Sequence, residues 1–221
     1  MRERGSALVS VILVLLVLTI VGVGIAYFTS MEDRLSGNTR ITKAGFYAAD
    51  AGLRRGEALL VEVINLDATA CGMPGVSQAR LTTLLTGRTP PILKVPGGGY
   101  DAEVLDLSTL PAAAVTCLGG NAKDARAYLN IPIPPPAGIS VVDRVSYSLY
   151  LRNNVDDTQG TDTLDTDSIV NLVSVGTVQL AAGVVVTKII EEQLVLTAGG
   201  GAVGGQKDVN AGGTNTVSGQ S

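Results

Sequence analysis

The sequence predicts an α+β fold in which one long N-terminal helix packs on a small antiparallel β-sheet. Three observations support this class. Residues 6–28 contain no charged side chain, residues 29–65 place apolar side chains at three- and four-residue spacing, and several segments after residue 140 alternate apolar and polar side chains. At 221 residues, the chain has room for one domain besides the helix.

The first half of the helix, residues 6–28, is long enough to span a membrane. About 20 helical residues, at ~1.5 Å each, cross a bilayer core of about 30 Å. Arg2 and Arg4 precede this span, so the positive-inside rule predicts a cytoplasmic N-terminus and an exported remainder. The sequence therefore predicts a single-pass membrane anchor followed by an extracytoplasmic domain.

The N-terminal signal differs from an ordinary secretory signal. Such a signal has an apolar segment of about 7–15 residues followed by a small-residue cleavage site. Here the apolar segment is longer and Gly5-Ser6 stands before it. This arrangement resembles the leader of type IV pilins and pseudopilins. The resemblance implies that a prepilin peptidase removes residues 1–5 and that Ser6 becomes the first mature residue, with a methylated amino group. A plain signal anchor is the alternative.

Ser10 departs from that resemblance. Major pilins usually carry a glutamate at the fifth mature position, where it is thought to pair with the terminal amine of a neighbouring subunit. Serine offers no such pairing. The departure is compatible with an initiating or tip-proximal subunit.

The second half of the helix, residues 29–65, reads as amphipathic. One predicted face carries Phe46, Ala49, Leu53, Leu60 and Ile64. Small residues in the same stretch permit close packing, either in a filament or on the chain's own domain, and the sequence leaves this choice open. These small residues are Ala44, Gly45, Ala48, Ala49, Ala51 and Gly52.

Two runs in this region resemble the N-terminal region of PilX-type minor pilins. Residues 32–40 read E-D-R-L-S-G-N-T-R and residues 44–52 read A-G-F-Y-A-A-D-A-G, close to the family patterns E-x-R-x-x-G-N and A-x-x-A-A-[DE]-A-G. The resemblance covers roughly residues 4–60 and implies the type IV pilin fold. It also implies a structural subunit of a type IV pilus that primes assembly, presents a tip adhesin, or does both.

The same resemblance implies partners and a location. The partners are other pilins and minor pilins, contacted through the N-terminal helix, together with the prepilin peptidase and a tip adhesin. The chain would lie in the inner membrane before assembly and in the extracellular pilus afterwards. The alternative within this class is the tip pseudopilin of a type II secretion system.

Residues 66–197 form the predicted globular head, and residues 198–221, rich in glycine and polar residues, are predicted to be a disordered tail. Cys71 and Cys117 both lie on the exported side, where an even count favours one disulfide, with two unpaired core thiols as the alternative. Strands are predicted over 100–107, 145–152, 168–176 and 184–196, and a short helix over 76–85.

One segment carries a candidate binding site. Residues 153–167 contain five aspartates and two asparagines, and Ca²⁺ takes oxygen ligands of this kind. The EF-hand pattern is absent, and acidic loops between strands are also common without a metal. A solvated loop therefore remains open beside a calcium site, and a signal-anchored metal- or ligand-binding module is the alternative function. The candidate ligands are Asn153, Asn154, Asp156, Asp157, Asp165 and Asp167.

Other functions find little support in the composition. The net charge of -4 argues against nucleic acid as a partner. The chain has no histidine, which removes the commonest general base and the commonest zinc ligand. No Gly-x-Ser-x-Gly motif is present. We therefore expect a structural protein and not an enzyme.

Overall fold

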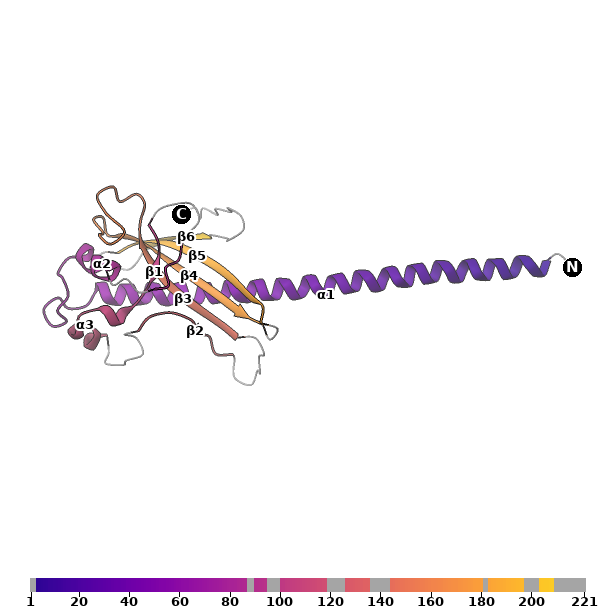
Figure 1. The fold of residues 1–221 in the computed structure, drawn as a ribbon, viewed down its shortest axis with the longest axis horizontal. Helices are drawn as coiled ribbons and strands as arrows, with labels where there is room; N and C mark the ends of the chain where they lie inside the picture. Colours follow the sequence, from indigo (N-terminus) through magenta and orange to yellow (C-terminus); the bar gives the residue numbers. More distant parts are fainter. Residues whose placement is uncertain are drawn as a thin grey trace. The chain divides into compact units, whose positions relative to one another are not determined.

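The computed structural model describes residues 3–86, 90–94, 100–118, 126–135, 144–180, 183–196 and 203–208, with side chains described from residue 10 to residue 196. The chain divides into an N-terminal unit, Met1–Thr42, and a C-terminal unit, Lys43–Ser221. The described elements (Figure 1) are α1 (Glu3–Ile64), α2 (Ser77–Thr86), β1 (Glu103–Val104), the 3-10 helix η1 (Leu107–Thr109), α3 (Ala112–Cys117), β2 (Ile131–Pro132), β3 (Arg144–Asn153), β4 (Ile169–Gln179), β5 (Val185–Val195) and β6 (Val203–Asp208).

The long N-terminal helix is confirmed. Helix α1 is assigned over 62 residues and includes both predicted halves, 6–28 and 29–65 up to Ile64. Near the N-terminus it contains a segment long and apolar enough to cross a membrane, and none of the 18-residue window that defines this segment is buried. The physical requirement for a membrane span is therefore met by length and composition.

The sheet of the C-terminal unit is antiparallel, with the strand order β1-β3-β4-β5-β6, and β2 also pairs with β3. Strands β3, β4 and β5 form a meander in which Tyr150 lies opposite Val173, and Val173 lies opposite Glu191. The predicted strands at 145–152, 168–176 and 184–196 and the predicted helix at 76–85 are confirmed as β3, β4, β5 and α2. Together with α1, the sheet confirms the predicted α+β, pilin-like arrangement.

The predicted strand at 100–107 is shorter than expected. Only Glu103–Val104 form a strand, and isolated bridges extend the pairing at Ala102 and Asp106. The Asp106 side chain accepts a hydrogen bond from the Ser108 backbone N–H and so caps η1. Because an aspartate in this role favours a turn, the chain leaves the extended conformation there.

Within the C-terminal unit, α1 approaches β4 closely. A Cβ on Gly176 would lie 2.1 Å from the Gly45 carbonyl oxygen and 2.5 Å from the Ala49 nitrogen. A Cβ on Gly52 would lie 2.4 Å from Ser174 Oγ. These distances are too short for any side chain. The sequence left the role of the small residues open, and the structure shows Gly45, Ala48, Ala49 and Gly52 buried in this contact, while Ala44 is half-buried and Ala51 exposed.

The predicted apolar face of this helix is correct at four of its positions and wrong at Phe46. Ala49, Leu53, Leu60 and Ile64 are at most 1% exposed, whereas the Phe46 side chain is 39% exposed. The reason is the close approach of the backbones, which selects glycine and alanine at this level and leaves no room for an aromatic ring.

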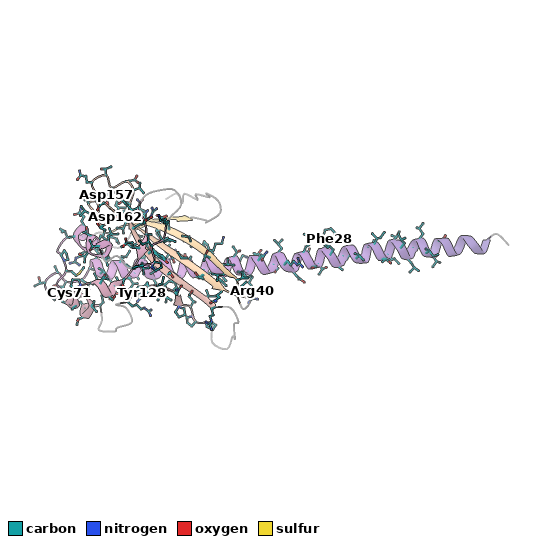
Figure 2. All side chains as sticks on the ribbon, viewed as in Figure 1. Phe28, Arg40, Cys71, Tyr128, Asp157 and Asp162 are labelled. Carbon is teal, nitrogen blue, oxygen red and sulfur yellow. A yellow bond between two sulfur atoms is a disulfide. The ribbon has the colours of Figure 1, made fainter. Side chains whose placement is uncertain are left out.

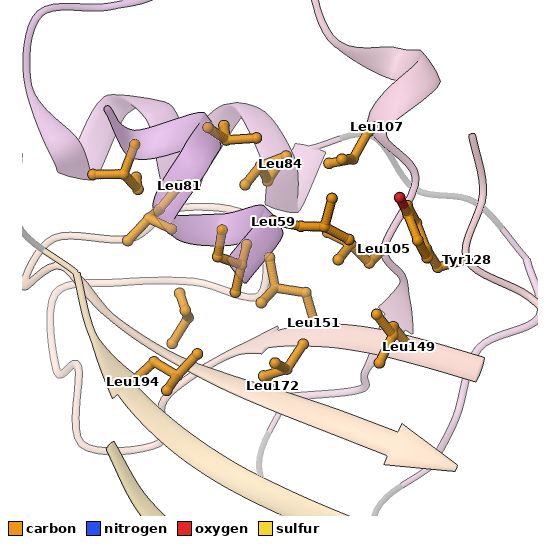
Figure 3. Packing of buried hydrophobic residues seen from close by; sticks show 14 of the residues in the cluster. Leu59, Leu81, Leu84, Leu105, Leu107, Tyr128, Leu149, Leu151, Leu172 and Leu194 are labelled. Atoms are coloured by element: carbon orange, nitrogen blue, oxygen red, sulfur yellow. The ribbon is translucent and has the colours of Figure 1, made fainter. Parts of the chain in front are cut away.

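The main hydrophobic core joins α1, α2 and the sheet (Figure 3). Leu59 of α1, Leu81 of α2 and Leu172 of β4 are each fully buried in one cluster. A second, smaller cluster includes Tyr150 and Val173, which neighbour each other across β3 and β4. Burial of a leucine side chain contributes about 1.5–3 kcal/mol. The sheet is therefore held by apolar contacts with the helices.

The predicted disulfide is confirmed. Cys71 and Cys117 are bonded, with their Cα atoms 5.8 Å apart, and they join the segment after α1 to the end of α3. The described part of the chain contains no free cysteine. The alternative of two unpaired core thiols is therefore wrong.

Arg80 of α2 caps the C-terminal end of α1. Its guanidinium, 3% exposed, donates hydrogen bonds to the carbonyl oxygens of Val63, Ile64 and Leu66 over 3.2, 2.6 and 2.6 Å, and its Nε donates to the Pro74 carbonyl over 2.5 Å. The last carbonyls of a helix lack partners within it and carry partial negative charge. Arg80 therefore supplies donors to the last two carbonyls of α1, and the backbone N–H groups of Asn65 and Leu66 supply others.

The prediction of a disordered tail over 198–221 needs correction at residues 203–208, which form β6 and pair antiparallel with Ile190–Val195 of β5. The physical reason is that β5, without β6, would present unpaired backbone groups at the edge of the sheet, and backbone pairing requires no apolar side chains. The rest of the predicted tail lies outside the described residues.

Glu192 of β5 is buried among acidic groups of α1 and makes stability depend on pH. Its side chain is 6% exposed. Burial is the main reason that its pKa is raised; the Glu57 charge adds to the shift, Arg54 opposes it and Asp50 adds to it. Because the pKa is higher in the folded state, the stabilising contribution is complete below the ordinary value of 4.5 and is lost as the pH rises through the folded-state pKa.

Replacing Glu192 by glutamine is therefore expected to stabilise the chain only at higher pH. E192Q should unfold at a higher urea concentration than the wild type at pH 8 and at a similar concentration at pH 4, because glutamine carries no buried charge. Urea titrations at the two pH values check this. Glu62→Gln, at an exposed position of α1, is the matched control. A gain for E192Q that is equal at both pH values would contradict the argument.

Candidate functional site

The loop between β3 and β4, residues 154–168, gathers acidic side chains at one end of the sheet. Figure 2 labels Asp157 and Asp162 on this loop. Asp157, Asp165 and Asp167 each offer one carboxylate oxygen, and these three oxygens lie within 4.8 Å of one another. Asp157 and Asp165 are 4% and 3% exposed. Three negative charges at this separation repel one another unless hydrogen bonds, protons or a cation compensate them.

Asp157 is compensated by hydrogen bonds. One oxygen accepts from the backbone N–H groups of Gln159 and Gly160 and from the Thr166 hydroxyl. The other accepts from the Thr166 N–H over 2.8 Å and from Asn153 Nδ2 over 3.3 Å. Burial alone would raise the pKa of Asp157, but the bonds from Thr166, Asn153 and Gly160 lower it to about 2. This carboxylate therefore organises the loop and has little capacity left for another ligand.

The negative charge of Asp165 is compensated by far fewer hydrogen bonds. Its Oδ2 accepts one hydrogen bond, from the Ser168 backbone N–H over 3.1 Å, while its buried Oδ1 has no partner among the described residues. Burial raises the pKa of Asp165 to about 7; the Ser168 N–H opposes this shift, and the charges of Asp167 and Asp157 add to it. The Asp165 carboxyl therefore reaches a low-energy state by holding a proton or by contacting a cation.

Asn154 adds a second buried oxygen to the cluster. Its Nδ2 donates to Asp167 Oδ2 over 2.9 Å, and Asp167 Oδ1 accepts from the Ile169 N–H over 2.9 Å. The Asn154 side chain is 1% exposed, yet its Oδ1 has no hydrogen-bond partner among the described residues. A buried oxygen without a partner costs about 1–3 kcal/mol.

Helix α2 holds the loop in place. Thr82 Oγ1 accepts a hydrogen bond from the Asp165 N–H over 3.2 Å, and Gln78 Nε2 donates to the Thr166 carbonyl over 3.0 Å. At the other side of the loop, the Tyr100 hydroxyl donates to the Gly160 carbonyl over 3.1 Å. Sequence reasoning missed these supporting residues, because their distance along the chain leaves no local pattern.

The structure divides the six predicted ligands into three groups. It brings Asp157, Asp165 and Asp167 together and links Asn154 to them. Asn153 is instead a structural residue: its Nδ2 donates to the Thr161 and Leu164 carbonyls, and its Oδ1 accepts from the Asn154 N–H. Asp156 is exposed and lies outside the group of three converging carboxylates. Asn153 therefore adjoins the cluster through its hydrogen bond to Asp157, Asp156 lies apart from it, and the assignment of these two residues as ligands stays a prediction.

The N-terminal unit presents a different surface, which is apolar. From Val11 to Phe28 the large apolar side chains of α1 are 48–67% exposed. Thr19 Oγ1 donates to the Leu15 carbonyl over 2.7 Å, so the polar side chain within this segment is satisfied by its own helix. The predicted processing residues, Gly5 and Ser6, lie in α1 ahead of this surface, and their side chains lie outside the described residues.

Comparison with known proteins gives a match at the N-terminus. Residues 4–54 match the model of the PilX N-terminal family. The match includes the apolar segment and both motif runs, and it confirms the predicted resemblance. No significant match to a curated protein or to a solved structure was found. Residues 4–54 are therefore similar to the N-terminal region that defines the PilX N-terminal family.

Proposed function

We propose that this chain is a minor pilin of a type IV pilus, a structural subunit without a catalytic step. One observation carries the proposal: the uncovered apolar side chains of α1 lie in the stretch that matches the PilX N-terminal family. Large apolar surfaces on a protein require lipid or a partner to cover them. In a minor pilin, lipid covers this surface before assembly and neighbouring helices cover it afterwards.

The working steps follow from this surface. Arg2 and Arg4 keep the N-terminus in the cytoplasm, and α1 anchors the exported C-terminal unit in the inner membrane. Prepilin peptidase removes residues 1–5, and with them the charges that oppose withdrawal of the helix from the membrane. Transfer into the filament then exchanges lipid contacts for van der Waals contacts with other pilin helices.

Ser10 supports an early or terminal position in the filament. A buried carboxylate at this depth would cost several kcal/mol unless it were paired with a group of a neighbouring subunit. Serine has neither this cost nor this pairing, so the subunit does not depend on a neighbour already in place. We therefore propose that the chain primes assembly, presents a tip adhesin, or does both.

Leader processing and filament recovery test this proposal. In cells with the prepilin peptidase and the pilus machinery, intact-mass analysis is expected to show that the chain lacks residues 1–5 and carries a methylated Ser6 amine. Part of the chain should be recovered with sheared filaments. Gly5→Val is expected to retain the leader and to remain in the membrane fraction, because a branched side chain replaces the glycine at the cleavage site.

Gly37→Ala is the matched control, since a Cβ at Gly37 meets no atom within 4 Å. This variant should lose the leader as the wild type does. A wild-type chain that still begins at Met1 in the presence of the peptidase, and that is absent from sheared filaments, would show the proposal to be wrong. Deletion of the chain should also reduce the number of pili per cell if it primes assembly.

A further inference from the structure

The acidic loop contains side-chain oxygens that accept no hydrogen bond from the described residues. Two oxygens stand out, Asp165 Oδ1 and Asn154 Oδ1. Both belong to side chains at most 3% exposed, and neither has a partner among the described residues. A protein that buries such atoms ordinarily satisfies them. The two side chains also adjoin a common neighbour, because Asp165 and Asp167 converge and Asn154 is hydrogen-bonded to Asp167.

The group that satisfies these oxygens is positively charged. Both unpartnered atoms are acceptors, and the converging carboxylates of Asp157 and Asp167 make the local potential negative. Each oxygen of Asp157 and Asp167 already accepts at least one hydrogen bond, whereas Asp165 Oδ1 and Asn154 Oδ1 accept none from the described residues. We propose that the loop binds one Ca²⁺ ion through Asp165, Asn154 and Asp167, with Asp157 fixing the shape of the loop.

The donor set favours calcium over other metals. All the available ligand atoms are oxygens, the chain contains no histidine, and both cysteines are joined in the disulfide, so a zinc ion finds neither nitrogen nor sulfur. Magnesium requires near-ideal octahedral geometry and releases its water reluctantly. An ion that reaches two almost fully buried oxygens must release water, and calcium does this more easily and accepts irregular geometry.

The loop is prepared for the ion by contacts that do not involve it. Asp157 accepts hydrogen bonds along the loop from Gln159 to Thr166, and α2 holds Asp165 and Thr166. Ser168 adopts a φ of 63°, in the left-handed region, and directs its N–H at Asp165 Oδ2. With only three protein ligands the remaining positions belong to water, so we expect a Kd of about 0.1–1 mM, as in extracellular calcium modules.

A calcium titration of the full chain in detergent tests the proposal. Unfolding is followed by tyrosine fluorescence at pH 8, in EGTA and in 10 mM CaCl₂, with NaCl added to match ionic strength. We expect calcium to raise Tm by about 3–8 °C, which is the shift for a ligand whose concentration is roughly 10–100 times its Kd. The Asp165→Asn variant should show a calcium shift of less than about 1 °C while remaining at least as stable as the wild type in EGTA, because it removes a buried charge.

Asp156→Asn is the matched control. It removes the same charge from the same loop at an exposed position and should keep the calcium shift. Three results would overturn the proposal: a wild type that does not respond to calcium, a response that survives D165N, or a response that D156N removes as completely as D165N does. The readout does not involve pili, so a negative result leaves the proposed pilus function untouched.

Discussion

Replacing Gly176 by alanine is expected to lower the free energy of unfolding of the C-terminal unit by about 3–4 kcal/mol, at or above the upper end of the usual cost of overpacking. The added Cβ would lie 2.1 Å from the Gly45 carbonyl oxygen and 2.5 Å from the Ala49 nitrogen. Both are backbone atoms of α1 and have no rotamer into which to move. The helix must therefore separate from β4, and the surrounding core contacts loosen with it.

Urea unfolding of the full chain in detergent, followed by tyrosine fluorescence, measures this loss, because every tyrosine except Tyr27 lies in the C-terminal unit. Gly75→Ala is the control: it lies in the same unit, and a Cβ there meets no atom within 4 Å. We expect that variant to differ from the wild type by less than about 0.5 kcal/mol. Equal stability of the Gly176 and Gly75 variants would mean that α1 does not approach β4 as closely as the structure shows.

The close approach of α1 to β4 explains which part of the fold was predictable. Apolar spacing and alternation are local, and they located α1 and the three long strands. Gly176 has no signature of its own: in sequence it is a weak point of a strand, and only the tertiary contact explains it. The error at Phe46 has the same origin, because a hydrophobic face was read from apolarity, whereas the contact selected small size. Strand β6 was missed because backbone pairing at an edge does not require apolar side chains.

The acidic loop shows the same division. Composition alone identified the segment and the oxygen-rich chemistry. It did not distinguish Asp157, whose two oxygens both accept several hydrogen bonds, from Asp165, whose carboxylate accepts only the one from Ser168 among the described residues. The difference in hydrogen bonding depends on the positions of Thr166 and α2 in the folded chain, and composition does not contain those positions. Nor did composition distinguish Asn153, whose amide donates to Asp157, or the exposed Asp156 from the residues whose oxygens lack a partner.

Removing the guanidinium of Arg80 should be at least as damaging as the Gly176 substitution. Arg80→Met is expected to cost about 3–5 kcal/mol, because several buried carbonyls lose their donor and each unsatisfied acceptor costs about 1–3 kcal/mol. Methionine keeps the apolar stem of the side chain but removes the donor to the carbonyls of Ile64, Leu66 and Pro74 and leaves Val63 with only the Leu66 N–H. It also removes the cation from the end of α1, whose last turn contains no basic residue of its own.

Arg80→Lys separates charge from geometry. Lysine restores the positive charge but cannot donate from two nitrogens in a fixed plane, so it should recover part of the loss, about half. Arg54→Met, at a side chain 66% exposed in surface ion pairs with Asp50 and Glu57, should cost less than about 1 kcal/mol. Since Arg80 and Thr82 belong to the same short helix, displacement of α2 should also disturb Asp165. A calcium response that weakens in R80M but not in R54M would show that the end of α1 and the acidic loop are coupled through α2.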